Sequence, residues 1–330
     1  MTGTPPPESE RPIRSSLIAP SAALAPPEGA LPSKSSVARL SIVSNSALIV
    51  LKIVAGALTG SIAIITEAVH SSIDLMASIV AYLSVRKADE PADESHMYGH
   101  AKIENLAAAI EGILILVGAG IIIFEAVRRL AEGAEALHSL GFGIAVVAIS
   151  TVVNLGVSGY LYGQARAHDS PALEGDAAHL RADALTSLAV LAGLVLVAIT
   201  GIEELDAVTA LVVAGAIVYA GLTILSRSSR VLVDEALPEG ELDIVRRAVE
   251  DYRGDELVSF HKLRGRRAGS ARYIDLHLQF ARGTTLERAH AIAHEVQDTV
   301  RSRIHTAELL VHIEPVDHPG SSSREQVDGR

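Results

Sequence analysis

Two stretches, His70-Ser-Ser-Ile-Asp74 and His179-Leu-Arg-Ala-Asp183, decide the fold of this chain. Each places a histidine four residues before an aspartate in apolar surroundings, and the copies stand more than a hundred residues apart. Because a helix turns once every 3.6 residues, residues four apart share one face. Two such helices, packed with those faces together, bring two imidazole nitrogens and two carboxylate oxygens to one point. This is a tetrahedral ligand set for a divalent metal, with zinc the first ion to consider.

The composition indicates a membrane protein with a polar part attached. Of 330 residues, 49% are hydrophobic and only 20% are charged, and the charges are unevenly spread. The chain has no cysteine, so disulfides are excluded and any metal ligands are nitrogen or oxygen donors. The net charge of −11, with no basic stripe to offset it, argues against a nucleic-acid partner.

Long apolar segments surround both motifs and predict six membrane spans of about 20 residues each. An ionisable group in the hydrocarbon core is costly unless it faces a bundle interior or a water-filled cavity. Glu67, His70 and Asp74, spaced three and four apart, are therefore expected on one inward face. Two spans are expected within 40–85, broken at 56–61, and the others at 101–127, 141–163, 176–200 and 207–226.

The distribution of basic residues indicates the orientation of the six spans. By the positive-inside rule, the side richer in lysine and arginine faces the cytosol, which places both termini there. Residues 1–35 are rich in proline, serine and alanine, and predict a disordered cytosolic tail before a six-helix transmembrane domain over 36–230. The loops on the cytosolic side carry Arg86, Lys87, Lys102, Arg166, Arg227 and Arg230, against Arg128 and Arg129 opposite.

Beyond the last span, 231–317 has the pattern of a small soluble α/β domain. Ile274, Leu276, Leu278 and Phe280 alternate with polar residues, as in a strand with one buried face. The expected order is α-β-β-α-β, a sheet with helices on one face, and 318–330 is expected to be a disordered tail. The elements are expected at 238–252, 257–263, 272–280, 285–304 and 308–316, with a turn at 264–270.

Two features leave alternatives open. Asp93, His96 and His100 in the loop after the second span have spacing that suits a metal site, but histidines in a solvated loop show the same pattern. Glu67 and Asp176 lie near the two motifs, where each fits either the lining of an ion path or a hydrogen bond between helices.

Several independent strings together resemble the cation diffusion facilitator family, and bacterial-type zinc/proton antiporters in particular. They are the paired His-x-x-x-Asp motifs, Pro-Ala-Asp-Glu-Ser-His-Met-Tyr-Gly-His-Ala-Lys at 91–102, Asp-Glu-Ala-Leu-Pro at 234–238, and the spaced histidines that follow. The resemblance implies a homodimer of six-helix transport domains in a lipid bilayer. It also implies a cytosolic metal-binding dimerisation domain of metallochaperone-like fold.

Position by position, the resemblance implies three metal sites and one charge pair. Glu314 stands where many relatives have aspartate, which keeps the donor oxygen but lengthens its reach. His294, four residues after His290, is expected to be a solvated surface histidine. The implied residues are His70, Asp74, His179 and Asp183 at the transport site; Asp93, His96 and His100 at a loop site; His261, His277, His290, His312 and Glu314 at a cytosolic site; and Lys102 with Asp234 in a charge interlock of the dimer.

The implied function is secondary active transport, not enzyme catalysis: Zn²⁺ leaves the cytosol across the inner (plasma) membrane in exchange for protons. Zn²⁺ is expected both as substrate and as a regulatory ligand of the cytosolic site. Two alternatives stay open, the same transporter with Fe²⁺, Mn²⁺, Co²⁺ or Cd²⁺ as its main ion, and a metal-sensing membrane scaffold that does not transport. An intramembrane metalloprotease is disfavoured because the sequence contains no His-Glu-x-x-His motif.

Overall fold

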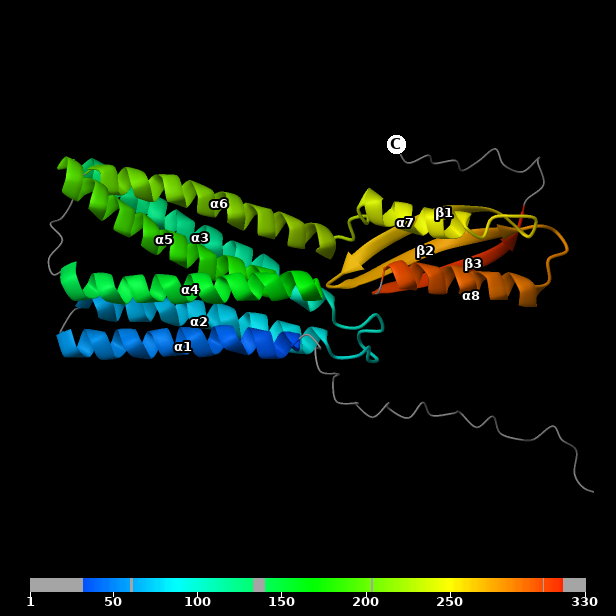
Figure 1. The fold of residues 1–330 in the computed structure, drawn as a ribbon, viewed down its shortest axis with the longest axis horizontal. Coiled ribbons are helices and arrows are strands. Elements are labelled where there is room, and N and C mark those ends of the chain that lie inside the picture. Colours follow the sequence, from blue (N-terminus) through cyan, green and yellow to red (C-terminus); the bar gives the residue numbers. More distant parts are fainter. Residues whose placement is uncertain (1–31, 60–61, 133–139, 203, 305, 317–330) are drawn as a thin grey trace, which may run out of the picture. The chain divides into compact units, whose positions relative to one another are not determined.

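The computed structural model describes residues 32–59, 62–132, 140–202, 204–304 and 306–316. Most of the two tails expected to be disordered lies outside these residues, but Lys34 and Ser35 already belong to the first helix. Six long helices make up the first part of the chain (Figure 1): α1 (Lys34–Thr59), α2 (Ile62–Ala88), α3 (Lys102–Glu132), α4 (Leu140–His168), α5 (Pro171–Thr200) and α6 (Glu204–Leu232).

The helices pack in pairs, with α1 against α2, α4 against α5, and α3 against both α6 and α5. The contact of α3 with α6 depends on two glycines. A Cβ atom on Gly112 would lie 3.0 Å from the backbone nitrogen of Leu225, and one on Gly221 would lie 3.0 Å from Cγ of Leu116. In a membrane, apolar side chains contact lipid as favourably as they contact protein. Helices therefore associate through close packing, which small residues permit.

Within the described residues, four of these helices contain segments long and apolar enough to cross a membrane. The segments are Lys34–Ala55, Lys102–Ala131, Pro171–Val197 and Glu204–Leu232. The prediction of a helical membrane domain is therefore confirmed. The spans predicted for α2 and α4 stay predictions, although both segments are helical as expected.

The second part of the chain folds into three strands and two helices. The order α-β-β-α-β is confirmed, and the strand order in the sheet is β1-β2-β3. Strand β2 pairs antiparallel with β1 and parallel with β3. The elements are α7 (Glu239–Glu250), β1 (Leu257–Ala268), β2 (Ala271–Phe280), α8 (Leu286–Arg303) and β3 (Ala307–Pro315).

The turn predicted at 264–270 is wrong for most of its length. Strand β1 continues to Ala268, with Gly265 opposite Ile274 and Ala268 opposite Ala271, so the turn is confined to Gly269 and its neighbour. Gly269 has φ +56°, which glycine adopts without a steric penalty. The arginine-rich segment resembles a loop in sequence, but pairing with β2 decides its structure.

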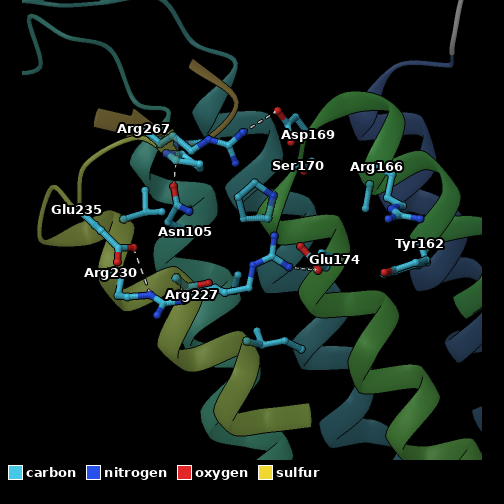
Figure 2. Close-up of a pocket in the computed structure, with 18 of the residues that line it drawn as sticks. Asn105, Tyr162, Arg166, Asp169, Ser170, Glu174, Arg227, Arg230, Glu235 and Arg267 are labelled. Carbon is cyan, nitrogen blue, oxygen red and sulfur yellow. Dashed lines mark hydrogen bonds and ion pairs between the residues drawn. The ribbon is translucent and has the colours of Figure 1, made fainter. Parts of the chain in front are cut away.

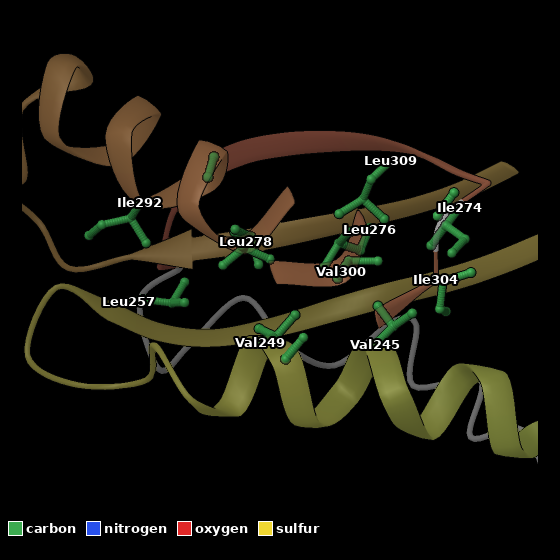
Figure 3. Packing of buried hydrophobic residues seen from close by; sticks show 14 of the residues in the cluster. Val245, Val249, Leu257, Ile274, Leu276, Leu278, Ile292, Val300, Ile304 and Leu309 are labelled. Atoms are coloured by element: carbon green, nitrogen blue, oxygen red, sulfur yellow. The ribbon is translucent and has the colours of Figure 1, made fainter. Parts of the chain in front are cut away.

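The core of this domain lies between the sheet and its two helices (Figure 3). Ile274, Leu276 and Leu278 are at most 1% exposed, as their alternation predicted, and they contact Val249 of α7 and Val300 of α8 within one buried cluster. Because side chains alternate across a strand, the intervening residues of β2 point to the opposite face of the sheet. That face is left for polar side chains, including the predicted metal ligands.

Candidate metal sites

The two His-x-x-x-Asp motifs lie on α2 and α5, and their described side chains meet inside the helical bundle. The Nε2 atom of His179 lies 3.3 Å from Oδ1 of Asp74 and 3.9 Å from Oδ2 of Asp183. Ligand atoms from these three residues lie within 4.8 Å of one another. His70 belongs to α2, one turn before Asp74, but its side chain lies outside the described residues.

The start of α5 fixes the position of its motif. The side chain of Ser170 caps the helix by accepting a hydrogen bond from the backbone N–H of Leu173, and Pro171 occupies the first turn. From this cap, His179 follows after little more than two turns. Gly175, one turn before His179, lets α5 approach α3, because a Cβ atom there would lie 3.1 Å from Cγ of Glu111.

Glu111 of α3 lies beside this candidate site, and the sequence did not identify it as a neighbour of the motifs. Its side chain is fully buried, and its Oε2 atom lies 3.6 Å from Nδ1 of His179. The available signal was a carboxylate in the middle of a predicted span, between the uncharged segments 106–110 and 112–124. That signal does not tell which helix face the residue occupies, so the contact with His179 required the structure.

Asp176 is accounted for by hydrogen bonds between helices, one of the two alternatives left open. Its Oδ1 atom accepts hydrogen bonds from Ser41 of α1 at 3.1 Å and from Ser78 of α2 at 3.0 Å. Asn45 of α1 donates to the Ser78 hydroxyl at 2.9 Å. The side chain of Glu67 lies outside the described residues.

The loop between α2 and α3 brings its three predicted ligands together. Oδ1 of Asp93 lies 3.3 Å from Nδ1 of His96, and Oδ2 lies 3.3 Å from Nε2 of His100. Asp93 also accepts hydrogen bonds from the hydroxyl and backbone N–H of Ser95, which hold the pKa of its carboxyl well below the usual range. An ionised carboxylate beside two imidazoles has the chemistry of a divalent-metal site.

On the open face of the sheet, three histidines lie at one register position across the strands. His261 of β1 is opposite His277 of β2, which is opposite His312 of β3. Glu314 joins them: its carboxylate oxygens lie 2.7 Å from Nε2 of His261, 3.1 Å from Nδ1 of His277 and 3.7 Å from Nε2 of His312. The longer reach of glutamate is thus used to contact all three rings.

His290, the remaining predicted ligand of the cytosolic site, is not brought into this group. It lies on α8, and its Nε2 atom is 3.1 Å from Nε2 of His294 one turn later. Helix α8 packs on the core face of the sheet through residues such as Ile292, whereas His277 lies on the other face. Within one chain, His290 and the three-histidine row are therefore separated by the sheet.

Lys102 and Asp234 form an ion pair within the chain, with 2.7 Å between Nζ and Oδ1. Arg266 contacts the same Oδ1 atom at 2.9 Å. The hydrogen bond from Lys102 is the main cause of a lowered pKa of the Asp234 carboxyl. A role of this pair in a dimer stays a prediction.

A cavity of about 510 Å³ lies beside the start of α5 and the end of α6 (Figure 2). Two arginines of its lining pair with carboxylates: Arg227 lies 2.7 Å from Glu174, and Arg230 lies 3.2 Å from Glu235. Among the residues that the structure describes, no predicted metal ligand lines this cavity.

A helical membrane domain that groups a histidine with two carboxylates, followed by a small domain with a histidine row, has the features of a membrane protein that handles divalent metal ions. Residues 38–233 match the family model described as the cation efflux transmembrane domain, and 237–316 match the cation efflux protein cytoplasmic domain. The chain belongs to the cation efflux, or cation diffusion facilitator, family. It is accordingly a cation efflux transporter and not an enzyme.

Relatives share most of their length with this chain. An uncharacterised transporter, sll1263, of Synechocystis sp. is 33% identical over 86% of this chain and 90% of its own length. The cation-efflux pump FieF of Serratia proteamaculans is 32% identical over 82% of this chain and 89% of its own length. A nickel form of the MamM CTD is 25% identical over 24% of this chain and all of that domain, with a TM-score of 0.23.

The contacts of Glu314 predict a pH-dependent contribution to stability. Burial raises the pKa of its carboxyl, but hydrogen bonds from Gln279 and His277 lower it more, so the net shift is downward. A carboxyl with a lowered pKa stabilises the fold above its unfolded pKa of about 4.3, and this contribution is lost as the pH falls through the folded value. We expect Glu314→Gln to lower the melting temperature of the metal-free protein at pH 7, and the difference to shrink below pH ~4. Circular dichroism melts with a chelator present measure this, and a difference that grows toward low pH would contradict it.

Proposed function

We propose that this protein exports Zn²⁺ from the cytosol in exchange for protons and works as a homodimer. The observation that carries the proposal is the buried group of Asp74, His179 and Asp183 at the meeting of α2 and α5. His70, one turn before Asp74 on α2, would supply the fourth ligand. One or two imidazoles with two carboxylates form a nitrogen and oxygen donor set that suits Zn²⁺.

Exchange follows from the chemistry of the ligands. A metal ion binds neutral imidazole and ionised carboxylate, so protons and Zn²⁺ compete for the same groups. With the site open to the cytosol, Zn²⁺ displaces protons; with the site open to the other side, protons displace Zn²⁺. Asp74 and Asp183 would supply the negative charge that offsets dehydration of the ion. Histidine, which changes charge between pH 5 and 8, would carry protons at His70 and His179.

The cytosolic row would hold a regulatory metal. His261, His277 and His312 with Glu314 supply three nitrogens and a carboxylate on one face of the sheet. Because the sheet separates it from this row, His290 would have to come from a second copy of the chain. A metal shared in this way would couple its binding to dimer formation, in keeping with the family of the cytoplasmic domain. The loop site of Asp93, His96 and His100 would be a third metal site.

The proposal places the protein in the inner (plasma) membrane of a bacterial cell, with both termini and the sheet domain in the cytosol. Bacterial relatives named as cation-efflux pumps support this placement. So does the concentration of arginine near the ends of α4 and α6, where Arg166, Arg227 and Arg230 line one cavity.

Metal flux into liposomes that contain the purified protein tests the proposal. An imposed pH gradient, a zinc dye and a pH dye together report the direction, the ion and the counterflow. We expect Zn²⁺ to move against the proton flow, and to do so faster than Fe²⁺, Mn²⁺, Co²⁺ or Cd²⁺. Liposomes with the Asp74→Asn variant are the control for leak. Zinc binding without flux would favour a metal-sensing scaffold. Faster flux of another ion would identify that ion, in place of zinc, as the substrate.

A further inference from the structure

A buried carboxylate lies near the ring nitrogen of His179 that is not turned toward the two aspartates. Glu111 of α3 is fully buried, and neither of its oxygen atoms has a hydrogen-bond partner among the residues that the structure describes. A carboxyl group that is buried without partners costs free energy, whether it is ionised or neutral. Its presence within a membrane helix therefore indicates a functional role. His179 lies beside it, with 3.6 Å between Oε2 of Glu111 and Nδ1 of the ring.

The two ring nitrogens of His179 face different groups. Nε2 is turned toward Asp74 at 3.3 Å and Asp183 at 3.9 Å, which makes it the nitrogen available to the metal. Nδ1 is turned the other way, toward Glu111. A neutral imidazole carries one N–H, and only its other nitrogen can bind a metal. An acceptor at Nδ1 therefore keeps the proton there and leaves the Nε2 lone pair directed at the metal.

The local packing holds Glu111 in this place. Gly175 of α5 leaves room for the Glu111 side chain, since a Cβ atom there would lie 3.1 Å from its Cγ atom and 3.2 Å from Cα of Ala108. Ala108, one turn before Glu111, lines the arginine-rich cavity. Glu111 itself is not among the described residues that line that cavity, and its Oε2 atom lies near His179 of the buried site.

We propose that Glu111 is a positioning residue of the transport site: its carboxylate, 3.6 Å from Nδ1 of His179, moves into hydrogen-bond distance of the Nδ1–H when the metal binds. It thereby sets the tautomer and orientation in which Nε2 binds the metal. The inference rests on the proposed function, because it assigns to a third helix a part in the site formed by α2 and α5. It implies that α3 must keep its register against α5 whenever the metal is bound. Glu111 would act through His179 and not as a metal ligand.

The test compares zinc flux of full-length variants in liposomes over a range of zinc concentrations. We expect Glu111→Ala to raise KM by ~10–100-fold, the usual cost of losing an outer-shell partner, with a smaller change in the maximal rate. Glu111→Gln should restore KM to within a few fold of the native value, because the amide oxygen still accepts the Nδ1–H. Glu125→Gln is the matched control, since Glu125 lies on the same helix but pairs with Arg129 at an exposed position.

The outcomes separate positioning from other roles. Equal losses in the alanine and glutamine variants would show that negative charge or direct ligation matters, and would overturn the proposal. A native KM in a folded alanine variant would overturn it as well. If Glu111→Ala does not fold, Gly175→Ala displaces the carboxylate without removing it, and a KM equal to the native value would then count against positioning.

A second measurement keeps this inference distinct from zinc export. The absorption spectrum of Co²⁺ bound to the full chain reports the ligand geometry whether or not the protein moves zinc. We expect Asp183→Asn and Glu111→Ala to change the same component of that spectrum, and Glu111→Gln to leave it nearly native. A spectrum unchanged by Glu111→Ala would overturn the positioning role, whether or not the native protein shows flux. Absence of native flux by itself would count only against the proposed function.

Discussion

The variant Asp183→Asn is expected to abolish metal flux. The carboxylate of Asp183 belongs to the buried ligand group, with Oδ2 3.9 Å from Nε2 of His179. An amide lacks the charge that offsets the ion, so the loss should exceed the roughly 10–100-fold effect of outer-shell changes. Initial rates of zinc uptake in liposomes, at equal amounts of folded protein, measure the loss.

A second buried carboxylate on the same helix supplies the matched control. Asp176 lies two turns before Asp183, is fully buried, and accepts hydrogen bonds from Ser41 and Ser78. In Asp176→Asn the amide oxygen can still accept one of these bonds, so we expect measurable flux and reduced thermal stability. Equal loss of flux in both variants would contradict the separation of ligand and structural roles, and retained flux in Asp183→Asn would remove Asp183 from the transport site.

The shared face of His179 and Asp183 was predictable, because helical periodicity places residues four apart on one face. Their meeting with Asp74 of α2 required the further expectation that the two motif faces pack together. The contact of Glu111 with His179 was not predictable, because it depends on the packing register of α3 against α5. That register is set by Gly175, whose missing side chain leaves the space that Glu111 occupies. A glycine within an apolar span gives no indication in the sequence of which residue on another helix fills its space.

The same contrast holds in the sheet domain. The buried face of β2 was predictable, since Ile274, Leu276 and Leu278 alternate with polar residues along one strand. The length of β1 was not, because the segment 264–268 has a loop-like composition and is held as a strand by pairing with β2. The place of His290 likewise depends on which face of the sheet α8 covers, which residue spacing does not specify.

Leu276→Ala is expected to destabilise the sheet domain by ~2–5 kcal/mol, the range found for buried leucine truncations. Leu276 is fully buried at the centre of the strand that pairs with both neighbours. Hydrogen–deuterium exchange of the detergent-solubilised full chain measures the effect, because faster exchange at β2 and α8 reports opening of this domain. Leu286→Ala is the control, since Leu286 is 70% exposed at the start of α8.

Loss of this core should also remove the proposed cytosolic metal site and leave the proposed transport ligands unchanged. The free energy of unfolding of a domain is typically only ~5–15 kcal/mol, so the destabilisation by Leu276→Ala is a large fraction of it. His277 follows Leu276 on β2 and its position across from His261 and His312 depends on an intact sheet. Leu276→Ala should therefore bind less zinc than the native protein while its transport site keeps its Co²⁺ spectrum. Native zinc stoichiometry together with fast exchange at β2 would show that the histidine row does not need the folded sheet, and would contradict the assignment of the cytosolic site.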